Sequence, residues 1–172
     1  QSRGHFLTGG AREKHFNLLK QWASAHEPAL REILGDQFIM FGEWMYASHS
    51  MFYDQLPHFF LEFDIYDRHR GVFLDSNTRQ KMLAGSPVVS VPIIHQGQAT
   101  GSRGWLEGMI RPSLGRSGQW ENEMQDQCLR HKQDPSRWRE RLDMAPVSEG
   151  LYIKQEGEGI VKGRYKFVRA SF

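Results

Sequence analysis

Three cationic side chains near the end of the chain occupy alternate positions, Lys162, Arg164 and Lys166. Residues at alternate positions of a β-strand project from one face, so this spacing predicts a line of positive charge. Fixed cations stabilise the charge that builds on a leaving pyrophosphate, which makes a clamp for a polyphosphate one interpretation. A strand face that is exposed to solvent is the other interpretation.

Two carboxylates border or interrupt apolar segments. Glu149 precedes residues 150–155, an apolar segment that carries Lys154, and Glu43 lies within the aromatic segment 38–46. Burying a carboxylate without a partner is unfavourable by several kcal/mol, so a buried one needs a ribose hydroxyl, a metal-bound water or a basic side chain. An exposed position is the alternative for each of the two carboxylates.

Helices that could position these residues are predicted from apolar spacing and capping residues. The sequence predicts an amphipathic helix over residues 11–26, a short helix from Pro28 to Gly35, a capped helix over 75–83, a helical face over 105–110 and helical residues 120–142 with a break at Asp134-Pro135. Between residues 97 and 118 the chain is rich in Gly, Ser and Arg. Arg103, Arg111 and Arg116 there either contact RNA or lie in a solvated loop.

Strands are predicted over residues 38–46, 58–66, 88–95, 150–155 and 160–168. The first is expected to be buried because it is rich in aromatic residues and almost free of charge. In the second, Phe59, Leu61, Phe63 and Ile65 share one face, and Glu62 and Asp64 share the other. Pro92 interrupts the third, which predicts a strand at an edge or an end. Strands separated by helices in this irregular order predict an α+β fold with largely antiparallel sheets.

The composition excludes several other classes of protein. A length of 172 residues with 39% hydrophobic content suits one domain, and 22 basic and 20 acidic residues nearly cancel. A single cysteine, Cys128, cannot form an internal disulfide, and the expectation of a cytoplasmic location rests on this alone. No segment approaches the roughly 20 apolar residues of a membrane span. Zinc-ligand spacing, a phosphate-binding loop and a nucleophile elbow are also absent from the sequence.

Five short segments, taken together and in order, resemble the ATP-dependent RNA ligases of the covalent nucleotidyltransferase superfamily. They are Ser2-Arg3-Gly4, Phe41-Gly42-Glu43, Phe60-Leu61-Glu62-Phe63-Asp64-Ile65, Glu149-Gly150-Leu151-Tyr152-Ile153-Lys154 and Arg164-Tyr165-Lys166. The text after the second segment, Trp44-Met45-Tyr46-Ala47, is most similar to the RNA ligase branch. The resemblance implies a nucleotidyltransferase (adenylation) domain of the ATP-grasp-like ligase type, of which residues 1–172 form a part.

The resemblance also implies the residues that bind the nucleotide. Arg3 would contact it near the ribose or the phosphates, and Glu43 would bind the ribose or help to hold a metal ion. Phe63 matches the aromatic residue that stacks on adenine, with a plain core phenylalanine as the alternative. Glu149 matches a carboxylate that acts through a catalytic Mg²⁺ and its waters, so Glu43 and Glu149 are the candidate metal ligands.

The basic pair of the final motif is carried over in the same way. Arg164 and Lys166 fit this pair best, and Lys162 with Arg164 is the other possible register. Lys154, which ends the preceding motif, is a weaker candidate for a phosphate contact because its parity along the strand differs from that of Glu149. ATP and Mg²⁺ are the implied cofactors, and RNA with 5′-phosphate and 3′-hydroxyl ends is the implied partner.

One element of the family pattern is missing from the sequence. The motif K-x-[DH]-G, whose lysine forms the lysyl-AMP intermediate, occurs nowhere in the chain, and Lys14, Lys20 and Lys81 are expected to be surface residues. In the family this lysine precedes the Arg3 motif by a short stretch. We therefore expect the chain to lack that segment and to be inactive in self-adenylation. A DNA ligase, another nucleotidyltransferase and a noncatalytic nucleotide- or RNA-binding module are the alternatives to an RNA ligase.

Overall fold

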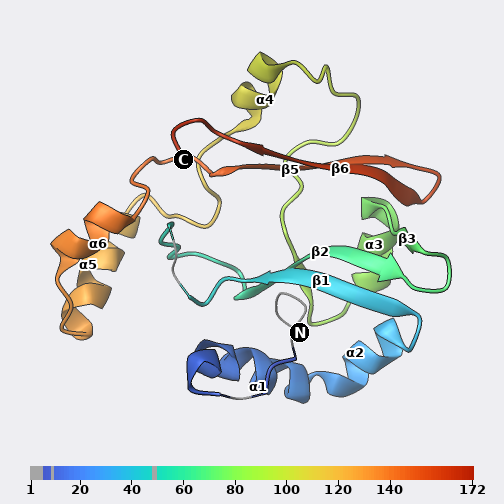
Figure 1. The fold of residues 1–172 in the computed structure, drawn as a ribbon, viewed down its shortest axis with the longest axis horizontal. Coiled ribbons are helices and arrows are strands. Elements are labelled where there is room, and N and C mark those ends of the chain that lie inside the picture. The colour runs from blue at the N-terminus through green and yellow to red at the C-terminus, as the bar shows by residue number, and fades with distance from the viewer. Residues whose placement is uncertain (1–5, 9, 48–49) are drawn as a thin grey trace. The chain divides into compact units, whose positions relative to one another are not determined.

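The computed structural model describes residues 6–8, 10–47 and 50–172 (Figure 1). Arg3, one of the predicted nucleotide contacts, lies outside the described residues. The chain forms two compact units, each built from several stretches of the sequence. The first unit comprises Gln1–Ala47, Phe59–Val91 and Glu156–Val161, and the second comprises Ser48–His58, Pro92–Gln155 and Lys162–Phe172.

A four-stranded sheet forms the centre of the first unit. Its strand β2 (Phe60–Asp67) pairs antiparallel with β1 (Phe38–Trp44) and β3 (Val72–Phe73), and parallel with β4 (Val89–Ser90). The strands predicted over 38–46 and 58–66 are thus confirmed with shorter bounds, whereas the strand predicted over 88–95 is reduced to two residues. Proline has no N–H to donate to a neighbouring strand, so Pro92 ends the pairing.

Two consecutive helices follow the predicted pattern in the first unit (Figure 1). A 3-10 helix, Ala11–Phe16, leads into α1 (Asn17–Ala25), and α2 (Glu27–Leu34) follows after one residue. Gly35 has a φ of 51°, a left-handed conformation that strains residues with a Cβ atom. Helix α2 therefore ends at the glycine, as the sequence predicts.

Helix α3 (Ser76–Leu83) confirms the capped helix predicted over 75–83. The Asp75 carboxylate accepts a hydrogen bond from the Thr78 amide at 2.8 Å, which satisfies an N–H that has no partner within the helix. Hydrogen bonding to the Thr78 side chain first, and to the Thr78 amide after it, lowers the pKa of the Asp75 carboxyl against the opposing effect of burial. The Glu156 carboxylate accepts from both the amide, at 3.0 Å, and the hydroxyl of Ser76, at 2.7 Å.

The core of the first unit lies between one face of the sheet and the helices. Its buried residues are Ile65, Leu74, Leu83 and Val88. Around them pack the partly buried residues Trp22, Leu30, Ile33, Phe38, Met40 and Met82. Helices α1, α2 and α3 thus cover the sheet face that contains Ile65 and Met40, which pair across β2 and β1.

The prediction that the segment 38–46 is fully buried is wrong. Side chains of β1 alternate between half-buried and exposed, and Ile39 and Phe41 are 42% and 40% exposed. The reason is that β1 is an outer strand of the sheet, and the core residues cover only one of its faces. Aromatic composition predicted the strand correctly but not its burial.

The prediction that Glu62 and Asp64 share a face of β2 is also wrong, because they pair with Gly42 and Phe41, consecutive residues of β1 that face opposite sides. Both side chains are fully buried. Strand β2 has neighbours on both sides, and so it lies within the unit. The Glu62 carboxylate is compensated by an ion pair with Arg79 of α3 and by a hydrogen bond from the Ser90 hydroxyl at 2.7 Å. A buried carboxylate with two such donors does not bear the full desolvation penalty.

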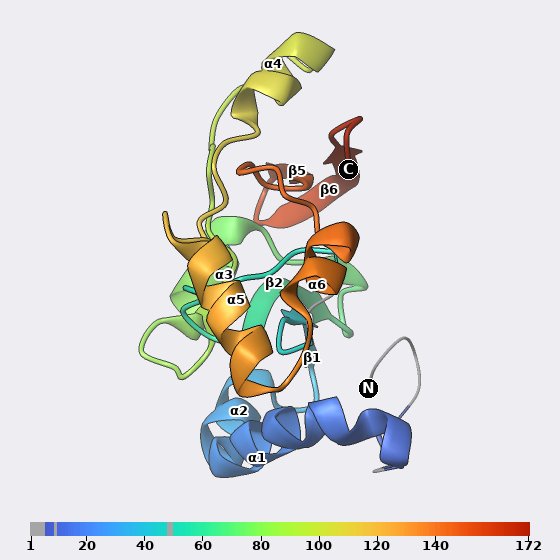
Figure 2. The same ribbon diagram turned by 90° about the vertical axis from the view of Figure 1, so that its left-hand side faces the viewer.

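The second unit contains three helices and most of a β-hairpin. The helices are α4 (Arg103–Met109), α5 (Trp120–Arg130) and α6 (Pro135–Arg141), so the predicted break at Asp134-Pro135 is confirmed. Helices α5 and α6 lie side by side in both views (Figures 1 and 2). Their core consists of the buried residues Phe52, Trp120, Met124, Cys128 and Leu142. Burial raises the pKa of the Cys128 thiol, as expected of a packed cysteine and not of a nucleophile.

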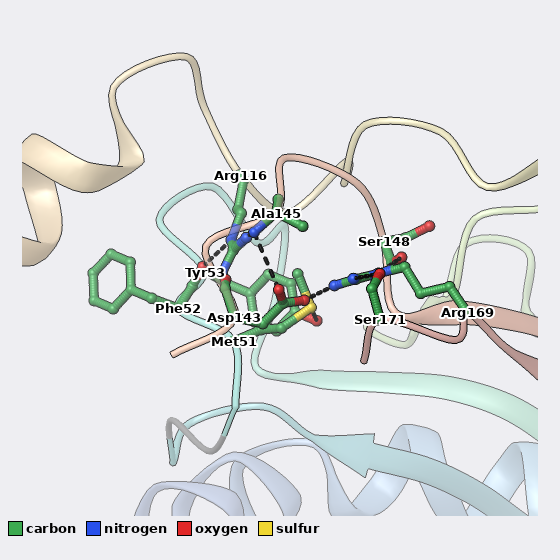
Figure 3. A network of polar contacts seen from close by, with 9 residues as sticks. All are labelled: Met51, Phe52, Tyr53, Arg116, Asp143, Ala145, Ser148, Arg169 and Ser171. Carbon is green, nitrogen blue, oxygen red and sulfur yellow. Dashed lines mark hydrogen bonds and ion pairs between the residues drawn. The ribbon is translucent and has the colours of Figure 1, made fainter. Parts of the chain in front are cut away.

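Arg116 lies buried in the second unit, where it connects three segments of the chain (Figure 3). Its guanidinium donates to the carbonyls of Phe52, Ala145 and Asp143 at 2.7 to 2.8 Å. Burial lowers its pKa, and the nearby Tyr53 opposes this effect. Both earlier interpretations of Arg116, an RNA contact and a solvated loop residue, are therefore wrong. Arg103 and Arg111 are exposed.

The hairpin consists of β5 (Gly150–Gly157) and β6 (Ile160–Val168), which confirms the last two predicted strands. Glu158 and Gly159 connect them with φ values of 59° and 81°. Positive φ at both positions is typical of the type I′ turn that closes tight hairpins. The tip of the hairpin belongs to the first unit and its two arms belong to the second.

Helices and mainly antiparallel sheets confirm the predicted α+β class. Among the described residues, no helix combines the length and apolar character that crossing a bilayer requires.

Candidate functional site

Glu43 lies on the face of the first unit's sheet opposite the helices. Residues that pair across an antiparallel ladder share a face, and Phe41 pairs with Asp64 while Glu43 pairs with Leu61. Glu43 and Phe41 are exposed, whereas Asp64 and Leu61 are buried. Of the two alternatives for Glu43, the structure supports the exposed position. Its carboxylate is accessible to a ligand on this face.

Phe63 occupies a β-bulge. The register of β1 and β2 shifts between Phe41, which pairs with Asp64, and Gly42, which pairs with Glu62, so that Phe63 lies at the shift. Bulges change the direction of a side chain and are frequent beside active sites. The simple alternation that grouped Phe63 with Leu61 and Ile65 therefore fails here, and the Phe63 side chain is half-buried. Two positions along β2 separate Phe63 from Leu61, the partner of Glu43.

Gly42 allows the register of β1 and β2 to shift at this point. A Cβ atom on Gly42 would come within 2.8 Å of the Leu61 carbonyl oxygen and would also collide with the Phe60 ring. The carbonyl belongs to the backbone of the neighbouring strand and cannot move aside. Only glycine therefore permits the close approach of β1 and β2 next to Glu43 and Phe63.

Asp64 is a candidate that the sequence interpretation missed. It follows Phe63, is fully buried, and lies on the same sheet face as Glu43. A buried carboxylate beside a bulge is the kind of group that functional sites contain. The signal available in the sequence was an aspartate inside an apolar segment, which strict alternation placed on the face of Glu62.

Glu149 lies in the second unit at the start of β5, where its backbone is held firmly. Its carbonyl accepts from the Arg169 amide at 3.1 Å, and the preceding Ser148 carbonyl accepts from the Arg169 side chain at 3.2 Å. Arg169 in turn forms an ion pair with Asp143 (Figure 3). Gly150 is required next to Glu149, because a Cβ atom there would lie 2.9 Å from Val168 Cα. The half-buried Glu149 side chain thus projects from a fixed backbone.

The predicted cations lie on the arms of the hairpin. Lys162, Arg164 and Lys166 are all exposed on β6. Lys154 is half-buried on β5, and its ammonium lies 5.5 Å from the centroid of the Tyr152 ring. Lys14 and Lys81 are exposed and Lys20 lies 3.8 Å from the Glu13 carboxylate, as expected for surface lysines.

The structure brings the candidates together in two sets. Glu43 and Phe63 lie on adjacent strands of the first unit. The second unit contains Glu149, Lys154, Lys162, Arg164 and Lys166 on one hairpin.

Each of the two sets contains a carboxylate that could bind Mg²⁺. No group of three or more His, Cys, Asp or Glu side chains that could hold a metal ion occurs among residues 6–8, 10–47 and 50–172. Mg²⁺ in nucleotide-dependent enzymes is commonly held by one or two carboxylates together with substrate phosphates. The exposed Glu43 and the half-buried Glu149 are carboxylates of this kind.

Comparison with known proteins gives one informative match. A family model described as RNA ligase matches residues 1–168, which is nearly the whole chain. Among curated proteins and among solved structures, nothing matches. The matched range includes all five segments named above.

Proposed function

Because this chain belongs to the RNA ligase family, we propose that it is part of an ATP-dependent enzyme that joins a 5′-phosphate to a 3′-hydroxyl end of RNA. The family match over residues 1–168 is the observation that carries the proposal. The proposed fold is the adenylation domain of covalent nucleotidyltransferases. The reaction proceeds in three steps through lysyl-AMP and RNA-adenylate intermediates.

In the first step a lysine nitrogen attacks the α-phosphorus of ATP. A nitrogen–phosphorus bond forms, the bond to pyrophosphate breaks, and AMP is stored on the protein. Phe63 stacks on the adenine and Glu43 binds the ribose. Their positions on adjacent strands, with Phe63 displaced by the bulge, support these roles.

The exposed cations of β6 suit the anionic part of the nucleotide. Arg164 and Lys166, or Lys162 with Arg164, bind the phosphates and stabilise the charge on the leaving pyrophosphate. Lys154 is a weaker candidate because its ammonium lies near the Tyr152 ring. Glu149 and Glu43 are the carboxylates that would hold Mg²⁺, and the ion when bound would supply neutralisation of the phosphate charge.

In the second step an RNA 5′-phosphate oxygen displaces the lysine from AMP. In the third, a 3′-hydroxyl oxygen attacks the adenylated 5′-phosphate, a phosphodiester forms, and AMP leaves. No lysine of the chain stands in the K-x-[DH]-G context, so we expect the chain alone to be inactive in self-adenylation.

The third step can be measured with the chain itself, because sealing of RNA that is already adenylated does not require a lysyl-AMP intermediate. We expect the chain, with Mg²⁺ and without ATP, to seal a nicked RNA whose 5′ end already carries AMP. Glu149→Ala should abolish sealing, whereas Glu123→Ala, at an exposed position of α5, should not change it. A chain that binds AMP but seals no adenylated nick would instead be the noncatalytic module.

The choice of acceptor needs a parallel measurement. Sealing of an adenylated all-DNA nick at the same rate as the RNA nick would favour a DNA ligase over an RNA ligase. Self-adenylation is measured separately with α-labelled ATP, and stable label on this exact chain would contradict its expected inactivity in that step.

A further inference from the structure

Tyr165 of β6 presents an aromatic ring to solvent. Its side chain is 57% exposed, although tyrosine has a large apolar ring. The ring lies against Gly163, since a Cβ atom on that glycine would lie 2.8 Å from the Tyr165 hydroxyl oxygen and 3.0 to 3.1 Å from two ring carbons. Gly163 thus allows the ring to lie along the strand, with much of its surface open.

A second tyrosine is exposed on the neighbouring strand. Tyr152 of β5 is 45% exposed, and the Lys154 ammonium lies 5.5 Å from its ring centroid. A cation near a ring is a favourable contact, and it brings positive charge next to an aromatic surface. Neither Tyr152 nor Tyr165 has a role in the nucleotide chemistry proposed above.

The arms of the hairpin are also strongly basic. Residues 150–155 and 162–168 contain the cations Lys154, Lys162, Arg164 and Lys166 and no aspartate or glutamate. The two acidic residues of the hairpin, Glu156 and Glu158, lie near its tip. By the alternation of a strand, Tyr165 lies on the opposite face of β6 from Lys162, Arg164 and Lys166, whereas Tyr152 and Lys154 share a face of β5. Proteins bind single-stranded nucleic acids with aromatic rings on which bases stack and with cations that hold the phosphates, and these arms carry both without carboxylates.

We propose that the arms of the β5–β6 hairpin bind unpaired nucleotides of RNA, with Tyr165 as the main stacking residue and Tyr152 as a second one. This inference rests on the proposed function, because it describes how the same protein holds its RNA. Every base offers a flat face to an aromatic ring, so the stacking is independent of sequence. The cations attract the phosphates between the bases, which makes the binding sensitive to salt.

The test is fluorescence anisotropy with a labelled, unstructured RNA of about 12 nucleotides, a length within the range of single-strand binding sites. The full chain is titrated at fixed salt without ATP. Tyr165→Ala should weaken binding by roughly 5- to 150-fold, the range expected for loss of one stacked base. Tyr165→Phe and Tyr165→Trp keep a ring and should bind within about twofold of the unaltered chain.

Two further variants separate stacking from other effects. Gly163→Ala changes neither the charge nor the Tyr165 side chain itself, but its methyl group forces the Tyr165 ring to move, so it should also weaken binding. Tyr46→Ala removes a tyrosine of similar exposure, 46%, from the first unit and should have no effect. Circular dichroism and thermal melting confirm that each variant is folded.

Unchanged binding by Tyr165→Ala would overturn the inference. So would a loss of affinity for Tyr165→Phe or Tyr46→Ala as large as that for Tyr165→Ala. Double-stranded RNA of the same length that competes as well as the single strand would also overturn it. The sealing assay on adenylated RNA distinguishes this inference from the proposed function. A chain that shows Tyr165-dependent RNA binding but no sealing would contradict the proposed function. A chain that seals but whose RNA binding does not depend on Tyr165 would contradict only the stacking surface.

Discussion

The guanidinium of Arg116 lies 4.0 Å from the centroid of the Trp120 ring, and the same guanidinium donates to three backbone carbonyls. This relationship connects the loop that contains Phe52, the start of α5 and the segment before β5. A planar guanidinium can stack on a ring and donate in several fixed directions at once, which an ammonium cannot do.

Arg116→Lys should therefore destabilise the protein by about 2–4 kcal/mol, because several backbone carbonyls lose their donors and the stacking is lost. Chemical denaturation followed by tryptophan fluorescence measures the change. Arg111→Lys, at an exposed position nearby in sequence, is the matched control and should alter stability by less than about 0.5 kcal/mol. Equal effects of the two substitutions would show that the Arg116 contacts contribute nothing.

The buried pair of Glu62 and Arg79 gives a second prediction. Arg79→Met removes the partner of a fully buried carboxylate and should destabilise the protein by about 3–5 kcal/mol. Glu62→Leu combined with Arg79→Met should recover a large part of that loss, since no unpaired charge is left. The exposed pair of Arg31 and Glu27 provides the comparison, and Arg31→Met should cost less than about 1 kcal/mol.

The fold could be predicted from the sequence wherever local signals decide it. The helices at residues 17–34, the Asp75 cap and the break before Pro135 depend on spacing and capping, and all are confirmed. Burial could not be predicted in the same way, because it depends on which neighbours a strand acquires. Glu62 is buried because Arg79 and Ser90, which are distant in sequence, supply its partners.

The candidate site, like the fold, could be predicted from the sequence only in part. The resemblance identified Glu43, Phe63 and Glu149, but it did not reveal that Phe63 lies in a bulge, since a shift of register is a property of two strands. Arg116 was misassigned for a similar reason, because its acceptors are backbone carbonyls, which leave no trace in residue types. Tyr165 was not predicted as a site residue because the exposure of its ring depends on the fold, and a tyrosine in a strand can equally be a core residue.

Gly42 next to Glu43 gives a third prediction. Gly42→Ala places a methyl group against the Leu61 carbonyl and the Phe60 ring and should destabilise the protein by about 1–3 kcal/mol. Gly104→Ala is the matched control, because that glycine lies in α4 with open space around it and alanine favours helix. The control should be neutral or slightly stabilising. An equally neutral Gly42→Ala would contradict the steric account of the bulge region.

A fourth prediction concerns pH and Asp67, whose side chain lies in the turn between β2 and β3. Burial raises the pKa of this carboxyl, but hydrogen bonds from the Arg70 and His69 amides and from the Gln37 side chain outweigh it, so the pKa falls below 3.8. In the unfolded chain the carboxyl takes up a proton at higher pH than in the folded protein. Its contribution is therefore complete above the unfolded pKa and is lost as pH falls through the folded pKa.

Urea midpoints measured from pH 6 down to pH 3 should accordingly decrease below about pH 4. Asp67→Asn should be less stable at pH 6, since its amide group would oppose the donating amide of Gln37, and its decrease at low pH should be shallower. Parallel curves for the two proteins would exclude Asp67 as a source of the pH dependence. Asp75, whose pKa is also lowered, contributes to the decrease that remains.

The central claim is that the predicted site residues of the first unit, Glu43 and Phe63, bind the nucleotide. The most direct measurement is a titration of AMP into the isotope-labelled chain, followed by the NMR amide signals of Glu43 and Phe63, which lie on adjacent strands. The account predicts that both signals shift with a single dissociation constant and that Phe63→Ala weakens binding. Unshifted signals of both residues at saturating AMP, or unchanged binding by Phe63→Ala, would contradict it.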